Sequence, residues 1–451
     1  MADDVIVIGA GLAGLQAALT LEAAGLSVRV LEAQQRIGGR IHSMRELGGT
    51  TEAGGTYIGA GYTRVISAAE RHGVELIDVT PLLQFFREQD LVLGREIIRQ
   101  RDWPTHRRNP FPDGDREHMP WNYHRVLAMR DNPLGAPEEW LDPRHAALDV
   151  SAHAWLKGLG LSDDAIEIAY GINPSFGRNA HDVSALLLLF RGAFSRMQRA
   201  HAPKDGIGFT ARDGVQRIPE AMARALRGRL ELGCEVVAIA DTATQLEVRC
   251  SSGSHFRAPR VIAAVPPGVL RKIAIDPPLP SEQATALASL PSQPLTQVYL
   301  RPRSRFWEAD GFAPSLFTDS RAGMIAAARD RLKPTEVTSL AVWVMGEEAA
   351  ALDRLAPEHA GLAVIGAIER IRPAAVGQLE LIGMHSWGAD PFAAGAWAYF
   401  RPGDVTRYAG IIGRSHGRLH FCGEHLALAN RGMEGAMESG ERAATEILAD
   451  G

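Results

Sequence analysis

The chain has 451 residues, of which 46 % are apolar and 22 % are charged, and its formal net charge is −5. This length predicts two or three domains with a large buried core. The slightly acidic balance supplies no basic field, so nucleic acid is not expected as a partner, and without a run of about eighteen apolar residues no membrane-spanning helix is expected.

The first element combines a strand, a glycine turn and the start of a helix. Its sequence is Val5-Ile6-Val7-Ile8-Gly9-Ala10-Gly11-Leu12-Ala13-Gly14. Leucines at three- and four-residue spacing continue the helix. A second apolar run, 28–31, then predicts another strand and ends in Glu32, eighteen residues after Gly14.

This order of elements predicts a dinucleotide site. Gly9 permits a tight turn, Gly11 lets the backbone approach a pyrophosphate, and Gly14 lets helix and strand pack closely. The helix N-terminus offers free N–H groups to phosphates. Glu32 can accept both ribose hydroxyls, which disfavours NADP. The expected cofactor contacts in this unit are Gly9, Gly11, Ala13, Gly14, Glu32 and Ala33.

Two glycine-rich stretches follow, Arg36-Ile37-Gly38-Gly39-Arg40 and Glu52-Ala53-Gly54-Gly55-Thr56-Tyr57-Ile58-Gly59. Paired glycines let a backbone lie against a flat or anionic group. The whole run resembles the N-terminal FAD signature of the flavin-containing amine oxidase family, which includes the monoamine and polyamine oxidases. The resemblance adds Gly39, Arg40, Gly55, Thr56 and Tyr57 to the expected FAD contacts.

The resemblance implies a two-domain α/β fold, with a Rossmann-type FAD-binding domain and an α+β substrate domain. We expect the FAD domain in three pieces, 1–76, 205–288 and 381–451, and the substrate domain in two. Of the latter, 77–204 is expected to be mainly helical and 289–380 to form a sheet. Residues 77–136, rich in proline, arginine and tryptophan, predict irregular structure with short helices.

The middle of the chain supplies helices and then a return to the FAD domain. The segments 151–159, 163–170 and 186–190 predict helices, the last apolar all round and hence buried, and the resemblance makes such helices one wall of the substrate cavity. The run 230–239 predicts a strand. By resemblance, Val236 in this strand presents its backbone to adenine.

The C-terminal segment resembles the second FAD motif of the family. Residues 419–424 predict a strand that ends in Gly423 and Glu424, and 431–440 open a helix. The resemblance places Glu424 at the ribityl or phosphate region. It places the Met433 N–H, at the positive end of the helix dipole, beside the flavin N1–C2=O locus.

The substrate face is expected between Trp387 and the start of the last helix. Trp387 matches a tryptophan that the family places beside the flavin, and Trp397 matches one wall of its aromatic cage. Ala396 stands where some relatives bond a cysteine to the flavin, so FAD is expected to be non-covalent. The opposite cage wall is Gly432, which leaves room for a bulkier substrate.

A second departure from the family concerns the residue near flavin N5. The family usually places a lysine nine residues before a Phe-Trp pair, and counting back from Phe306-Trp307 gives Gln297. A glutamine can hold a water but carries no charge. Rapid reaction with oxygen is therefore in question, whereas flavin binding is not.

Three cysteines, Cys234, Cys250 and Cys422, show no metal spacing and predict reduced, mostly buried thiols in the cytoplasm. No metal cluster is expected. The N-terminus enters a strand by Val5, which leaves no room for a signal peptide, and the C-terminus carries no apolar tail, so no membrane anchor is expected.

These observations predict an FAD-dependent amine oxidoreductase that oxidises the C–N bond of a small or medium-sized amine to an imine, which water hydrolyses. Oxygen or another electron acceptor completes the cycle, and a homodimer is expected. The alternatives are a C–C desaturase of the same fold, a flavin-binding carrier, and an L-amino-acid oxidase. The last needs an arginine for the carboxylate, for which Arg178, Arg191 and Arg196 are candidates.

Overall fold

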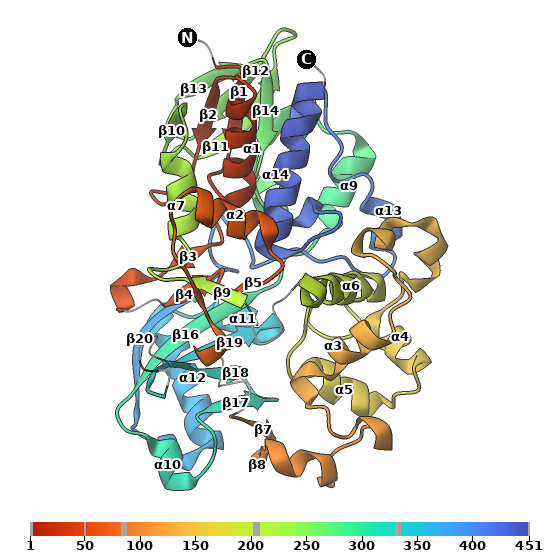
Figure 1. Ribbon diagram of the computed structural model, residues 1–451, viewed down its shortest axis with the longest axis vertical. Coiled ribbons are helices and arrows are strands. Elements are labelled where there is room, and N and C mark those ends of the chain that lie inside the picture. The colour runs from red at the N-terminus through yellow and green to blue at the C-terminus, as the bar shows by residue number, and fades with distance from the viewer. Residues whose placement is uncertain are drawn as a thin grey trace.

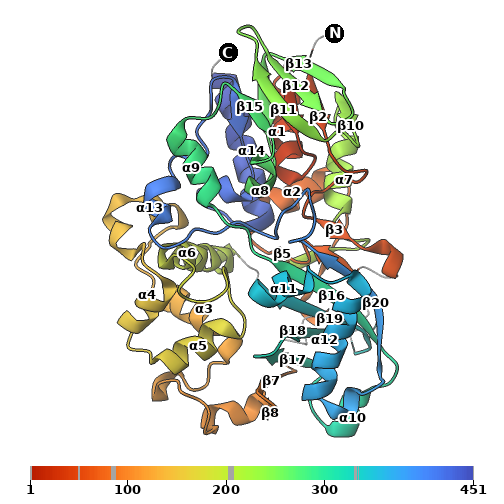
Figure 2. The same cartoon turned by 180° about the vertical axis from the view of Figure 1, so that it is seen from behind.

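The computed structural model describes residues 3–48, 51–82, 88–201, 208–329, 333 and 335–449. One lobe, at the top of Figure 1, contains both ends of the chain, a parallel sheet and the helices α1 and α14. The other lobe has a large sheet on one side and a group of helices on the other, and the view from behind agrees (Figure 2).

The strands are β1 Val5–Ile8, β2 Val28–Leu31, β3 His42–Ser43, β4 Glu52–Gly54, β5 Ile58–Gly59, β6 Leu76–Asp78, β7 Gln89–Leu93, β8 Glu96–Arg99, β9 Gly208–Ala211, β10 Arg229–Glu231, β11 Val236–Asp241, β12 Leu246–Cys250, β13 His255–Ala258, β14 Arg260–Ala263, β15 Ala274–Asp276, β16 Leu295–Pro302, β17 Ser315–Thr318, β18 Met324–Arg329, β19 Val337–Met345, β20 Leu379–Ser386 and β21 Leu419–Phe421. The helices are α1 Leu12–Ala23, α2 Thr63–Arg71, α3 Pro120–Arg130, α4 Ala152–Gly158, α5 Asp163–Gly171, α6 Ala185–His201, α7 Arg217–Arg224, α8 Pro267–Leu270, α9 Ser281–Ser289, α10 Phe306–Asp310, α11 Gly346–Leu352, α12 Pro357–Ile371, α13 Asp404–Tyr408 and α14 Gly432–Ala449.

The parallel sheet of the upper lobe has the strand order β10-β2-β1-β14-β21. All four residues of β1 and of β2 are buried, as expected for strands covered on both faces. Helices α1 and α14 lie side by side against this sheet (Figure 1). Their close approach depends on Gly440, where a Cβ atom would lie 2.3 Å from the carbonyl oxygen of Ala13.

The predicted strand 230–239 is two strands in two different sheets. β10 joins the parallel sheet, whereas β11 joins a sheet of order β13-β12-β11-β15. The chain turns between them at Gly233, whose φ of +68° favours glycine. The prediction of a single strand was therefore wrong, although Val236 lies in a strand as expected, at the start of β11.

The large sheet of the lower lobe has the order β20-β16-β19-β18-β17-β7-β8. β7 and β8 form a hairpin within 77–136, where irregular structure was predicted, and β17 pairs with β7 in parallel. The dense proline and tryptophan just beyond this hairpin obscured its apolar residues in the sequence. β20 ends at Ser386, so the boundary expected near residue 380 falls inside a strand of this sheet.

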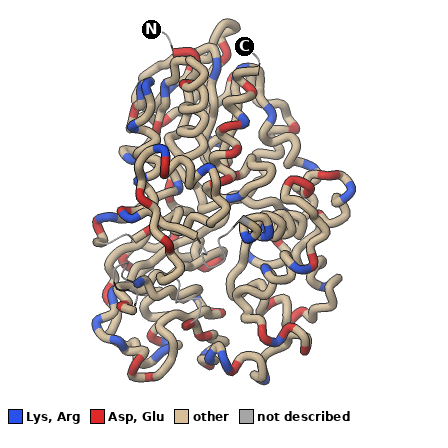
Figure 3. The backbone as a smooth tube through the Cα atoms, in the orientation of Figure 1, with Lys and Arg blue, Asp and Glu red and all other residues tan. Residues whose placement is uncertain are grey.

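The helices of the lower lobe confirm the predicted segments. Ser151 caps α4 by accepting a hydrogen bond from the Ala154 N–H, and α5 begins at Asp163. Residues 186–190 of α6 are all buried, and α6 lies between the two lobes (Figure 1). Acidic and basic residues are interspersed over both lobes (Figure 3). None of the described helices is long and apolar enough to cross a membrane.

Candidate active site

A cavity of about 540 Å³ runs between the parallel sheet and helix α6. At one end it is lined by residues that follow β1 and β2, and at the other by residues of α6 and the start of α14. Of the residues predicted from sequence, those that line it are Gly9, Gly11, Ala13, Glu32, Ala33, Gly39, Arg40, Gly55, Tyr57, Val236, Trp397, Gly423, Glu424, Gly432 and Met433. Gly14, Thr56, Trp387 and Gln297 do not line it.

The glycine turn after β1 has the geometry that a dinucleotide site requires. Gly9 has φ of +105°, and a Cβ atom there would lie 2.8 Å from the Ala264 carbonyl oxygen. Gly14 lies inside α1, where a Cβ atom would lie 2.0 Å from the Gly9 carbonyl oxygen. Gly11 precedes α1 without a capping side chain, so the first N–H groups of the helix are available to an anion at the cavity.

Glu32 stands at the end of β2 and is only 5 % exposed. Its two carboxylate oxygens accept hydrogen bonds from the N–H groups of Ala10 (2.8 Å) and Gln34 (2.9 Å). Burial raises the pKa of Glu32, although these N–H groups act in the opposite direction. The bonds orient a carboxylate at the cavity wall beside Ala33 and Val236, which is the acceptor that an adenosine ribose needs.

The cysteines at this end correct a prediction. Cys234 and Cys250 form a disulfide, whereas three reduced thiols were expected; Cys422 is free and buried. β11 and β12 pair in antiparallel fashion with Val236 opposite Cys250, which brings the two sulfur atoms together. The separation of 16 residues gave no sign of this pairing, because it depends on the strand register.

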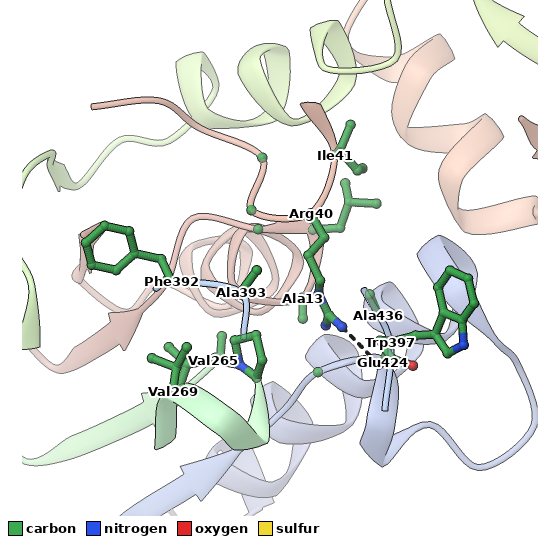
Figure 4. Close-up of a pocket in the computed structure, with 18 of the residues that line it drawn as sticks. Ala13, Arg40, Ile41, Val265, Val269, Phe392, Ala393, Trp397, Glu424 and Ala436 are labelled. Atoms are coloured by element: carbon green, nitrogen blue, oxygen red, sulfur yellow. Dashed lines mark hydrogen bonds and ion pairs between the residues drawn. The ribbon is translucent and has the colours of Figure 1, made fainter. Parts of the chain in front are cut away.

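Arg40 and Glu424 meet at the middle of the cavity (Figure 4). One Arg40 nitrogen, Nη1, lies 3.1 Å from Glu424 Oε1 and donates to the Ala396 carbonyl oxygen at 3.0 Å. Glu424 also accepts the N–H of Ala398 at 3.0 Å. Burial opposes the charge of Glu424, but Arg40 and Arg431 outweigh it and hold the pKa of the carboxyl below its ordinary value. Glu424 therefore remains ionised and orients Arg40, a role that was not predicted.

The start of α14 and the loop before it make the far wall. Gly432 and Met433 both line the cavity, and Trp397 lines it from the loop after β20. A Cβ atom on Gly432 would have only one neighbour within 4 Å among the described residues, the Tyr62 hydroxyl at 3.7 Å. The buried Nε1 of Trp397 finds no hydrogen-bond partner in the described chain, so it can donate to a ligand.

Trp387 and Gln297 lie behind the cavity wall. Trp387 donates to the Ala53 carbonyl oxygen at 2.8 Å, and its ring fills the space beside Gly54. Gln297 is fully buried in β16, and its side-chain amide forms a hydrogen bond with the Tyr299 hydroxyl. That hydroxyl also donates to the Glu52 carbonyl oxygen, so the amide is best oriented with Nε2 donating to Tyr299. The amide oxygen of Gln297, Oε1, is then left without a hydrogen-bond partner among the described residues.

Several lining residues were missed by sequence reasoning. They are Tyr62, Ser175, Phe176, Phe194, Ser195 and Lys272. Tyr62 packs against Phe194 with ring centroids 5.9 Å apart. These residues come from separate segments, and none belongs to a motif. The apolar run of α6 predicted burial, but it did not indicate which side of the helix faces a cavity.

The three candidate arginines have different positions. Arg178 is exposed and pairs with Asp182 at 3.2 Å. Arg196 donates to the Met129 carbonyl oxygen at 2.8 Å and does not line the cavity. Arg191 does line it, on the wall formed by α6. In the sequence, the feature that pointed to Arg191 was its position directly after an apolar helical run.

The parallel sheet, the glycine turn and the acidic residue at the end of β2 define a dinucleotide-binding protein. The chain belongs to the flavin-containing amine oxidoreductase family, whose model matches residues 12–448. It is therefore an enzyme with a flavin cofactor, and it oxidises an amine. The desaturase and L-amino-acid oxidase alternatives are not favoured.

Curated relatives and solved structures agree with this assignment. A flavin-containing amine oxidase of Danio rerio is 27 % identical over 463 residues, covering 99 % of this chain and 85 % of that protein. Amine oxidase B of Homo sapiens is 25 % identical over 471 residues, covering 99 % and 86 %. Wild-type putrescine oxidase bound to putrescine is 26 % identical with a TM-score of 0.77, covering 100 % and 99 %. Cyclohexylamine oxidase from Brevibacterium oxydans, 22 % identical, has the same fold with a TM-score of 0.78, covering 100 % and 99 %.

Proposed function

We propose that the protein holds FAD without a covalent bond and oxidises the C–N bond of a small or medium-sized amine to an imine, which water hydrolyses to an aldehyde or ketone. FAD, when bound, supplies the two-electron chemistry. The residues of the chain then have three tasks: they bind the cofactor, orient the amine and exclude water.

The glycine turn and Glu32 together carry the FAD assignment. Free N–H groups at the start of α1 suit the pyrophosphate, and the oriented Glu32 carboxylate suits the ribose. Arg40, held by Glu424, is a cation for the phosphate or ribityl region. Non-covalent binding rests on Ala396, which lines the cavity beside Trp397 and offers no nucleophile.

Trp397 would orient the amine with its ring, opposite the open space at Gly432. The open space at Gly432 suits amines that are bulkier than those accommodated by the aromatic cage of the family. The names of two solved neighbours, putrescine oxidase and cyclohexylamine oxidase, agree with a small or medium-sized amine. Oxygen or another acceptor would take up the electrons.

Two measurements test this function. Purified protein should be yellow, and acid precipitation should release FAD into the supernatant; flavin that stays with the precipitated chain would refute non-covalent binding. Amines added under anaerobic conditions should bleach the flavin absorbance. A protein that binds flavin but is bleached by no amine would be a carrier instead.

Three further expectations belong to this proposal. The five segments given above divide the chain between the FAD and substrate domains, with the last boundary placed after β20 because that strand belongs to the substrate sheet. The protein forms a homodimer, and its location is the cytoplasm. The Cys234–Cys250 disulfide is unusual for that compartment. Light scattering of the purified protein tests the dimer. Thiol titration of protein isolated directly from cells tests whether the pair is oxidised there.

A further inference from the structure

The substrate end of the cavity contains two arginines, and among the described residues the only carboxylate within 4 Å of either is Glu424, which Arg40 also contacts. Arg191 projects from α6, and Arg431 directly precedes α14. Their guanidinium groups share one aromatic neighbour: Arg191 lies 5.8 Å and Arg431 5.4 Å from the ring centroid of Phe176. Both cations therefore lie close to the Phe176 ring.

Arg191 is held in place by a hydrogen-bond chain. It donates from Nη1 to the Ser175 hydroxyl oxygen at 2.6 Å. Burial holds the pKa of His124 well below its ordinary value, so this histidine is neutral. With Nδ1 donating to the Ala169 carbonyl oxygen, Nε2 accepts the Ser175 hydroxyl hydrogen. The Ser175 oxygen is thereby turned toward Arg191, and the other N–H groups of Arg191 find no partner in the described parts of the chain.

Arg431 is 8 % exposed and donates no hydrogen bond to any described residue. Its Nη2 lies 3.8 Å from Glu424 Oε2, whereas Arg40 and the Ala398 N–H contact Oε1 of the same carboxylate at 3.1 and 3.0 Å. Burial and mutual repulsion lower the pKa of Arg191, but a guanidinium stays charged at neutral pH. Arg40, Arg191 and Arg431 therefore line the cavity with Glu424 as their one shared carboxylate among the described residues. Buried charge that is not fully paired is unfavourable, so an anionic group in the ligand would relieve it.

The carboxylates of the cavity lie elsewhere. Glu32 and Glu235 belong to the end near Val236, and Glu424 is engaged by Arg40. Among the described lining residues, none is therefore free to pair with a second ammonium group at the substrate end. The site repels a dication and attracts an anion.

We propose that Arg191 and Arg431 form an anion subsite, and that the substrate is an amine carrying a carboxylate remote from the C–N bond that is oxidised. This inference rests on the proposed amine oxidation. We place the carboxylate remote from that bond because Arg191 lines the cavity from α6, whereas Gly39 and Gly55, which the family resemblance assigns to FAD, line it from other segments. The subsite supplies both arginine side chains as donors in forked geometry, which suits a carboxylate.

Substrates of one length and different charge test the proposal. Anaerobic flavin reduction is measured with 6-aminohexanoate, hexylamine and 1,6-diaminohexane, and we expect 6-aminohexanoate to react at the lowest concentration. Arg191→Gln and Arg431→Gln should each raise its half-saturating concentration roughly 10- to 100-fold, because a charge-assisted hydrogen bond is lost. Hexylamine has no carboxylate to lose, so the ratio of the half-saturating concentration of 6-aminohexanoate to that of hexylamine should rise in both variants. Hexylamine or the diamine reacting as well as 6-aminohexanoate would overturn the subsite, and a preference for norleucine would overturn the remote placement.

Binding of a carboxylate that cannot react separates this proposal from the proposed function. Hexanoate should bind the oxidised holoenzyme, compete with 6-aminohexanoate and shift the flavin spectrum, with a dissociation constant that rises in both arginine variants. Arg199→Gln is the matched control, since it removes an exposed charge from the same helix. If no amine reduces the flavin but hexanoate binds through these arginines, the subsite stands and the amine oxidation fails. If Arg431→Gln loses FAD while hexanoate binding to the remaining holoenzyme is unchanged, Arg431 serves the cofactor and the subsite is wrong.

Discussion

The two ends of the cavity are built in different ways. The end beside β1 and β2 is shaped by backbone: Gly9 and Gly14 let the turn and the helix approach closely, and one carboxylate, Glu32, is held by two N–H groups. The end beside α6 is shaped by side chains from several distant segments, among them Phe176 and Arg431. Cofactor binding should therefore be sensitive to few residues, whereas substrate choice is spread over many.

The largest expected effect concerns the cofactor end. Glu32→Ala removes two hydrogen bonds to a charged ribose acceptor, each worth about 1.5–3 kcal/mol, so FAD affinity should fall by roughly 10²- to 10⁴-fold. Titration of the apoprotein with FAD measures this. Glu235→Ala is the control, because Glu235 lines the same end but is exposed. Equal affinity loss in both variants would mean that Glu32 has no specific role.

In the wild type, the Glu32 carboxylate accepts hydrogen bonds from the N–H groups of Ala10 and Gln34. Glu32→Ala leaves these two N–H groups without that acceptor. The thermal unfolding of the apoprotein should therefore be compared before and after the change. An apoprotein that unfolds before FAD is added would place the defect in the turn rather than in ribose binding.

The next effect concerns Gln297, which stands where the family usually has a lysine near flavin N5. Gln297 lies on the face of β16 that meets β4 through Tyr299 and Glu52, and β4 leads to the cavity-lining Gly55. Its amide carries no charge, so anaerobic reduction should be ordinary and reoxidation by oxygen slow. Gln297→Lys should accelerate reoxidation by roughly 10²-fold, the effect of one preorganised donor, and stopped-flow mixing with aerated buffer measures it.

Gln297→Leu is the neutral control for this change, because it fills similar space without a charge and should not accelerate reoxidation. FAD content shows whether the buried lysine is tolerated. Rapid reoxidation of the wild type that the lysine leaves unchanged would mean that another cation, such as Arg431, already serves the flavin, or that the alignment of β16 with the family is wrong.

The difference between the two ends of the cavity also explains which parts of the site could be predicted from the sequence. The glycine turn and Glu32 are local: a strand, a turn and a helix in one short stretch have one arrangement, so their place at the cavity was predictable. Arg191 and Phe176 meet only through tertiary packing, and the disulfide between Cys234 and Cys250 depends on strand register. Trp397 and Gly432 were found through family resemblance, because no local rule brings a loop and a helix start to one cavity.

A smaller effect is expected at the substrate end. Trp397→Ala removes one wall of the cavity and a free Nε1 donor, so the rate of flavin reduction by an amine should fall roughly 10- to 100-fold through loss of orientation. FAD content should change much less, since the glycine turn and Glu32 are untouched. Both are measured on the same preparation. Parallel loss of flavin and of reduction rate would make Trp397 part of the folded core.

The smallest effect tests the open space opposite Trp397. Gly432 has φ of +57°, so any side chain there is strained by about 1–2 kcal/mol. Gly432→Ala carries that strain without filling the cavity, because its Cβ would meet only the Tyr62 hydroxyl at 3.7 Å. Gly432→Phe adds a ring, and relative to Gly432→Ala it should raise KM by roughly tenfold for the bulkiest accepted amine and less for a short one. If the KM values of Gly432→Phe and Gly432→Ala differ by the same factor for large and small amines, the ring has not narrowed the substrate space. Gly432 would then serve only the turn into α14, and the breadth of substrate choice would have to come from the α6 wall.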